Sequence, residues 1–166
     1  MQLLLIRHGT AEDVAPDGDD ARRSLTKAGR DEMKEVATGL RALVDSIDVI
    51  AASPLLRAQQ TAEIVAHAYG DLNVETVQSL RPGSDLSVLA DWLARQASAK
   101  VVAVVGHEPH LGLLVTWFMT GAGNSRVVLS KGGAALLEFT SRAAPGSGIL
   151  QWLLDRHALR RLGGKS

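Results

Sequence analysis

The chain has 166 residues, of which 46% are hydrophobic and 22% are charged, as is typical of a soluble globular protein. Eighteen basic and eighteen acidic residues give a net charge of zero, which argues against binding to nucleic acid or to a membrane surface. The absence of cysteine excludes disulfides and thiolate metal or redox chemistry. No apolar run approaches the ~20 residues that span a bilayer, and no signal sequence is evident, so we expect a cytoplasmic protein.

The first predicted element is a short buried strand over residues 3–6, which are all leucine or isoleucine. Arg7, His8 and Gly9 follow it directly. Both polar side chains lose solvation where a buried strand ends, so stability alone does not explain them. Because arginine keeps its charge, an anionic partner explains the pair better. Gly9 would let the backbone turn and a ligand come close.

A polar segment over residues 11–24 follows, and it is either a loop over the mouth of the site or an ordinary surface segment. Thr26 then resembles the N-cap of an amphipathic helix. The next strand covers residues 47–52 and ends at Ser53 and Pro54, which predict an N-cap and the first position of a helix over residues 54–69. Arg57 lies in the first turn of that helix.

Further elements alternate in the same way. A short strand over residues 74–77 and a turn at 81–83 precede a third helix, capped by Ser84 or Asp85. The five residues 101–105 are the clearest buried strand, and Gly106, His107, Glu108 and Pro109 end it. An apolar helix over residues 111–119 comes next.

Two strands over residues 134–140 and 148–154, joined by a turn, predict an antiparallel pair near the end of the chain. The basic tail over residues 156–165 is more typical of a solvated end than of a binding site. Alternating strands and helices predict an α/β fold, a three-layer sandwich with a mostly parallel central sheet and helices on both faces. We find no linker or repeat, and expect one domain over residues 1–166.

Three of the predicted strand-to-helix junctions carry cationic or histidine side chains: Arg7 and His8, Arg57, and His107. Such junctions share one edge of a parallel sheet, where α/β proteins bind their ligands. Helix N-termini expected at Pro54 and Pro109 would add N–H groups and dipole ends that favour an anion. Arginine suits multi-point contact with phosphoryl oxygens, and histidine can be protonated or act as a nucleophile. The sequence therefore predicts a phosphate site.

Structural interpretations compete with this one. A single histidine after a strand is usually a satisfied core residue, and a single arginine in a first helical turn is usually a surface residue. His107 and His110 could suggest a metal site, but without cysteine or convincing carboxylate partners we expect no metal. Lys131, Gly132 and Gly133 are not a phosphate loop, because the spaced glycine before the lysine is absent.

Three motifs carry a family resemblance. Arg7 to Thr10 (RHGT) resembles the signature of the histidine phosphatase superfamily, residues 53–62 (SPLLRAQQTA) resemble its second motif, and residues 105–108 (VGHE) its third. Within that superfamily, the short length, the start of the chain (MQL), residues 25–29 (LTKAG) and residues 107–109 (HEP) most resemble the SixA-type phosphohistidine phosphatases. The resemblance implies that His8 is the nucleophile, that Arg7, Arg57 and His107 bind the phosphoryl group, and that no cofactor is needed.

The proton donor is unassigned. Relatives supply a glutamate from the middle of the chain or an aspartate after the second histidine, whereas residues 79–83 contain no carboxylate before Asp85. Glu108 is a possible acid. Alternatively, it does not contact the substrate and instead orients the residues that do. The mechanism also needs His8 unprotonated on its attacking nitrogen and His107 protonated, so we expect their surroundings to push the two pKa values apart.

The leading hypothesis is a phosphatase that removes phosphoryl groups from phosphohistidine on a partner protein. One alternative is a phosphatase for small phosphoesters. Another is a phosphate-sensing or protein-binding module that has lost turnover.

Overall fold

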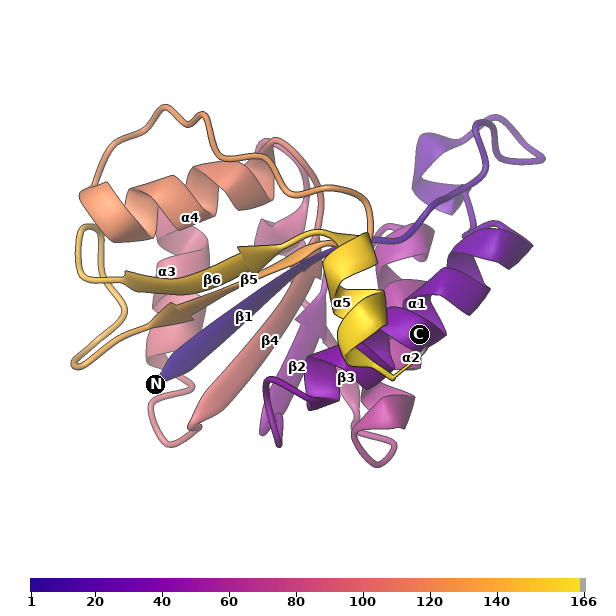
Figure 1. The fold of residues 1–166 in the computed structure, drawn as a ribbon. Helices are drawn as coiled ribbons and strands as arrows, with labels where there is room; N and C mark the ends of the chain where they lie inside the picture. Colours follow the sequence, from indigo (N-terminus) through magenta and orange to yellow (C-terminus); the bar gives the residue numbers. More distant parts are fainter. Residues whose placement is uncertain (165–166) are drawn as a thin grey trace.

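A computed structural model describes residues 1–164, in which six strands form one mixed sheet in the order β3-β2-β4-β1-β5-β6 (Figure 1). The first four in that order are parallel to one another, and β5 and β6 are antiparallel additions at one side. The predicted fold class is confirmed, and each strand lies within two residues of its predicted position. The strands are β1 (Gln2–Arg7), β2 (Val49–Ala52), β3 (Val74–Thr76), β4 (Val101–Gly106), β5 (Ala134–Glu138) and β6 (Ile149–Leu154).

Helices cover both faces of the sheet, as Figure 1 shows. Alternate residues of a strand point to opposite faces, so Leu3 and Leu5 pack on one face and Leu4 and Ile6 on the other. The first face packs against α3 and α4, and the second against α1, α2 and α5. The helices are α1 (Lys27–Arg41), α2 (Leu56–Ala68), α3 (Leu86–Ala94), α4 (His110–Thr120) and α5 (Arg156–Leu162), with short 3-10 turns η1 (Asp20–Arg22) and η2 (Gln78–Leu80). None of the described helices is long and apolar enough to cross a membrane.

Side-chain caps start three of these helices. Thr26 caps α1 as predicted, because its hydroxyl accepts a hydrogen bond from the Gly29 N–H at 2.8 Å. Asp85, not Ser84, caps α3. The prediction for α2 is wrong: the helix begins at Leu56 instead of Pro54, and its N-cap Leu55 has no side-chain cap. Ser53 instead accepts a long 3.4 Å bond from the Leu55 N–H in the turn before the helix.

The prediction of a solvated C-terminal tail holds only in part for the described residues, because the tail forms a helix that packs on α1 through one side. Asp155 caps α5, whose Leu159 is fully buried against α1. Gly39 of α1 makes this approach possible, because a Cβ there would overlap the Leu159 carbonyl oxygen. Arg160 also pairs with Glu35 of α1 at 2.6 Å. Periodicity over seven residues is too short to reveal such a helix, and Lys165 lies outside the described residues.

Candidate active site

Parallel pairing of β1 and β4 places the two predicted histidines side by side. Arg7 lies opposite Gly106 in the register, and the His8 N–H donates to the Gly106 carbonyl at 3.1 Å. Each strand therefore ends at the same level, with His8 and His107 as the next residues. Their rings have centroids 5.0 Å apart and are tilted by 54°. Arg57, the second residue of α2, is close enough to lower the pKa of both imidazoles. The structure thus brings together residues from the three predicted junctions.

His8 is held in one orientation by its backbone neighbours. Its Nδ1 lies 2.7 Å from the Gly9 carbonyl oxygen, so Nδ1 carries the proton and Nε2 keeps its lone pair. The Gly9 N–H donates to Thr61 Oγ1 at 3.1 Å, and the Thr61 hydroxyl donates to the Arg57 carbonyl at 2.7 Å. Gly9 is required for packing on α1, because a Cβ there would lie 2.6 Å from Met33 Cγ. Thr61, which sequence reasoning did not single out, therefore links the His8 turn to α2.

Both arginines are anchored in the same way. Arg7 Nη1 donates to the Leu129 carbonyl at 2.7 Å, and Arg57 Nη1 donates to the Asp20 carbonyl at 2.9 Å. Arg57 Nη2 also donates to Asp20 Oδ2 at 3.1 Å. In each guanidinium the Nε atom is buried and unpartnered. A backbone carbonyl thus fixes each side chain while its Nε edge stays free for a ligand.

Four buried side-chain nitrogens lack a hydrogen-bond partner within residues 1–164: Arg7 Nε, Arg57 Nε, and Nδ1 and Nε2 of His107. All four belong to residues that the sequence placed in the site. An unpartnered buried polar atom costs about 1–3 kcal/mol, so proteins rarely keep one without a reason. Two guanidinium N–H groups and an imidazole that converge without partners are suited to bind an oxyanion.

The expectation that the surroundings separate the two histidine pKa values is wrong. Burial and the neighbouring arginines lower the pKa of His8 to about 4, against the opposing effect of its bond to Gly9. Burial, His8 and Arg57 lower the pKa of His107 to about 3. Both imidazoles are neutral at pH 7, because the arginines and the loss of water disfavour a third positive charge.

Glu108 contacts the segment that anchors Arg7. Its Oε1 accepts a hydrogen bond from the Leu129 N–H at 2.9 Å, and the Leu129 carbonyl is the group that anchors Arg7. Burial raises the pKa of Glu108, and the Leu129 N–H and Arg7 oppose this effect. Gly112 permits the close approach of the loop, because a Cβ there would overlap the Val127 carbonyl oxygen. Of the two predicted roles, these contacts favour orientation over proton donation.

His110 has a separate role. It is buried, and its Nε2 hydrogen-bonds to the Ser79 carbonyl at 3.1 Å, which ties α4 to η2. Within the described part of the chain, no three histidine, aspartate or glutamate side chains are grouped as metal ligands would be.

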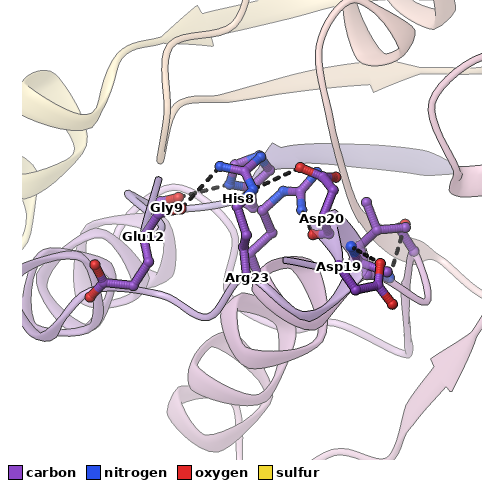
Figure 2. Close-up of polar contacts among 10 residues, drawn as sticks. His8, Gly9, Glu12, Asp19, Asp20 and Arg23 are labelled. Carbon is purple, nitrogen blue, oxygen red and sulfur yellow. Dashed lines mark hydrogen bonds and ion pairs between the residues drawn. The ribbon is translucent and has the colours of Figure 1, made fainter. Parts of the chain in front are cut away.

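Asp20 is the main residue that sequence reasoning missed. It comes from the polar segment over residues 11–24. Part of this segment therefore lies over the site, in agreement with the first interpretation, a loop over the mouth of the site. Figure 2 shows Asp20 bonded to Arg23, which extends to the Glu12 carbonyl. Slight burial raises the pKa of Asp20, but the hydrogen bonds and charges of Arg23 and Arg57 outweigh it and lower the pKa overall. The concentration of Asp and Arg after the RHG motif was the available signal.

Comparisons with known proteins point to one family. The family model of the histidine phosphatase superfamily (branch 1) matches residues 3–82. An uncharacterised protein of Picosynechococcus is 37% identical over 135 residues, which are 80% of this chain and 82% of that protein. The chain belongs to the histidine phosphatase superfamily.

Two further similarities cover nearly the whole chain. The phosphohistidine phosphatase SixA of Escherichia coli is 30% identical over 159 residues, which cover 93% of this chain and 94% of SixA. A structure of the protein histidine phosphatase SixA complexed with tungstate superposes with a TM-score of 0.84 at 27% identity, covering 96% and 99% of the two chains. The chain is thus a SixA-like phosphatase of this superfamily.

Proposed function

We propose that this phosphatase hydrolyses phosphohistidine on a partner protein, without a metal, through a phosphoenzyme formed at His8. The observation that carries the proposal is the set of four buried, unpartnered nitrogens beside a histidine whose Nε2 is free to attack. That set matches the needs of a transferred phosphoryl group, which calls for positively charged donors and a nucleophile in fixed positions.

Each site residue has a distinct role in this reaction. The Nε2 lone pair of His8 attacks phosphorus, and the bond between phosphorus and the substrate nitrogen breaks. Arg7 and Arg57 bind the phosphoryl oxygens with their free Nε edges. His107 gains a proton as the anion enters, since a nearby negative charge raises an imidazole pKa, and it then donates to a third oxygen. Water hydrolyses the phosphoenzyme and restores His8.

The relatives support both the anion and the substrate class. Tungstate is an oxyanion with the shape of phosphate, and the similar SixA structure holds it. SixA of Escherichia coli is a phosphohistidine phosphatase and is similar over nearly its whole length. The chemistry fits as well, because imidazole leaves more readily than an alkoxide, which needs a well-placed proton donor.

A panel of substrates tests the proposal. We expect kcat/KM for a phosphohistidine peptide to exceed that for a simple alkyl phosphate by at least about 10²-fold, the lower end of what general acid catalysis supplies. Activity should persist in a metal chelator. Equal efficiency on both substrates would favour the small-phosphoester alternative. No turnover of any substrate by the folded protein would favour the phosphate-sensing module.

A further inference from the structure

We propose that Asp20 recognises the leaving imidazole of the phosphohistidine substrate by accepting a hydrogen bond from its ring N–H. The inference rests on the proposed function and deepens it, because it assigns to one residue the preference for a phosphorus–nitrogen bond.

One guanidinium connects Asp20 to the phosphoryl site. The Nη atoms of Arg57 donate to the carbonyl and to Oδ2 of Asp20, whereas Nε is buried and unpartnered. A phosphoryl group on the Nε edge and the carboxylate at the Nη tips can therefore be held at the same time. An imidazole substrate carries its phosphoryl group on one nitrogen and can carry a proton on the other, so it presents two polar functions across one small ring. The Arg57 guanidinium places a partner for each.

The Asp20 carboxylate is held by protein groups on one side and is exposed to solvent on the other. Arg23 Nε donates to Asp20 Oδ1 at 2.7 Å, and Arg23 Nη1 donates to the Glu12 carbonyl at 3.0 Å. Asp19 caps the η1 turn that begins at Asp20. The Asp20 side chain is nevertheless 65% exposed, whereas that of Arg57 is 6% exposed. Asp20 thus lies at the mouth of the site, where the leaving group must depart.

The charges around Asp20 favour an N–H donor as its ligand. Arg57 and Arg23 contact it directly, and its negative charge also acts on His107. Because the two arginines lower its pKa, Asp20 is ionised at neutral pH and has no proton to give to an alkoxide. It can instead accept a strong, charge-assisted hydrogen bond from a protonated ring. Glu108 does not compete for this role, because its carboxylate holds the Leu129 loop.

The step is balanced without another reactant. The new bond joins His8 Nε2 to phosphorus, and the bond from phosphorus to the substrate ring breaks. Its electron pair stays on the ring nitrogen, and the ring leaves as neutral imidazole because its other nitrogen already carries a proton. Asp20 stays ionised throughout and favours that protonated form of the ring.

The test compares two phosphoryl donors, phosphoimidazole and 4-nitrophenyl phosphate, whose leaving group has no N–H. Asp20→Asn keeps the backbone carbonyl that anchors Arg57 but removes the charge. We expect the ratio of kcat/KM for phosphoimidazole to that for 4-nitrophenyl phosphate to fall by at least about tenfold, the effect of losing one charge-assisted hydrogen bond. Asp20→Glu should restore most of the ratio. Asp17→Asn is the matched control, because Asp17 lies in the same segment and pairs with exposed Arg22.

Three outcomes would overturn the inference. Equal losses on both donors would mean that Asp20 only positions Arg57. Equal gains would mean that its carboxylate only competes with phosphate for Arg57. Unchanged kcat/KM on both donors would leave Asp20 without a part in the reaction. Failure of the proposed function itself is distinguishable, because the unmodified protein would then turn over phosphohistidine peptide no better than an alkyl phosphate, or would turn over neither.

Discussion

At the scale of single residues, the site depends on donors that are anchored at one end and free at the other. Arg7 and Arg57 each donate a hydrogen bond from Nη1 to a backbone carbonyl, and the Nε atom of each has no partner within the described residues. This anchoring removes rotamer freedom before the substrate arrives, so the cost of ordering the guanidinium is met during folding. Preorganised donors of this kind contribute most when the charge of the transition state develops between them.

Arg57→Lys tests whether the forked donor matters beyond its charge. Lysine keeps the positive charge but lacks the rigid planar fork that contacts Asp20 through Nη and presents Nε to the phosphoryl group. We expect kcat/KM to fall on the order of 10²-fold, by analogy with the loss of one preorganised transition-state donor. Steady-state kinetics with phosphohistidine peptide measures the effect. Full activity in the variant would mean that Arg57 supplies only positive charge.

Two substitutions at Glu108 separate orientation from acid catalysis. Glu108→Gln keeps an oxygen that can accept the Leu129 N–H, so we expect less than about a tenfold loss, well short of the 10²–10⁴-fold effect of a general acid. Glu108→Ala leaves that N–H without its partner and loosens the carbonyl that anchors Arg7, so its loss should be larger. Kinetics of both variants on phosphohistidine peptide provides the measurement. Equal, large losses in the two would point to proton transfer by Glu108.

At the scale of elements, the parallel pairing of β1 with β4 does the main work of assembly. It sets His8 and His107 at one level, and the Ser53 N–H bonded to the Val105 carbonyl sets the chain that enters α2 beside them. These elements could be predicted because residues 3–6 and 101–105 are continuous apolar runs, and because strand ends in such sheets share one edge. The positions of Arg7, His8, Arg57 and His107 follow from that topology.

Other contacts could not be predicted because they join segments that are distant in sequence and carry no periodic pattern. Asp20 meets Arg57 across 37 positions, and Glu108 meets Leu129 across 21. The end of α2 was predicted well, but its start was displaced by two residues because Ser53 caps a turn and not the helix. The pKa of His8 depends on burial and on both arginines, whereas that of His107 depends on burial, His8 and Arg57, so neither value could be predicted from the residue alone.

Helix α5 provides a test of packing at this scale. Replacing a helical glycine with alanine ordinarily stabilises a helix by about 1 kcal/mol. Gly39→Ala should do the opposite, because the added Cβ would overlap the Leu159 carbonyl and displace α5 from α1. The free energy of unfolding in urea measures the sign. As a control, Thr38→Ala changes an exposed neighbour on the same helix. Stabilisation by Gly39→Ala would contradict the packing of α5 described above.

At the scale of the whole molecule, the buried histidines link stability to pH. The pKa of His8 is lowered on folding from 6.5 to about 4, so the unfolded chain binds more protons between these values. The contribution of His8 to the free energy of unfolding is therefore fully present above pH 6.5 and declines as the pH falls towards 4. Between pH 7 and pH 5 we expect the wild-type free energy of unfolding to fall by about 2 kcal/mol more than that of His8→Asn. Urea titrations at the two pH values test this, and parallel losses would mean that His8 is not buried as a neutral ring.

The central claim is that His8 carries the phosphoryl group during turnover. The most direct measurement mixes the protein with phosphohistidine peptide, quenches the reaction in alkali, where phosphohistidine survives, and locates the modified residue by mass spectrometry. We predict a phosphoryl group on His8 in the wild type, and none in His8→Ala, which should fold but not turn over substrate. Near wild-type hydrolysis by His8→Ala, or a phosphoryl group on another residue, would contradict the account.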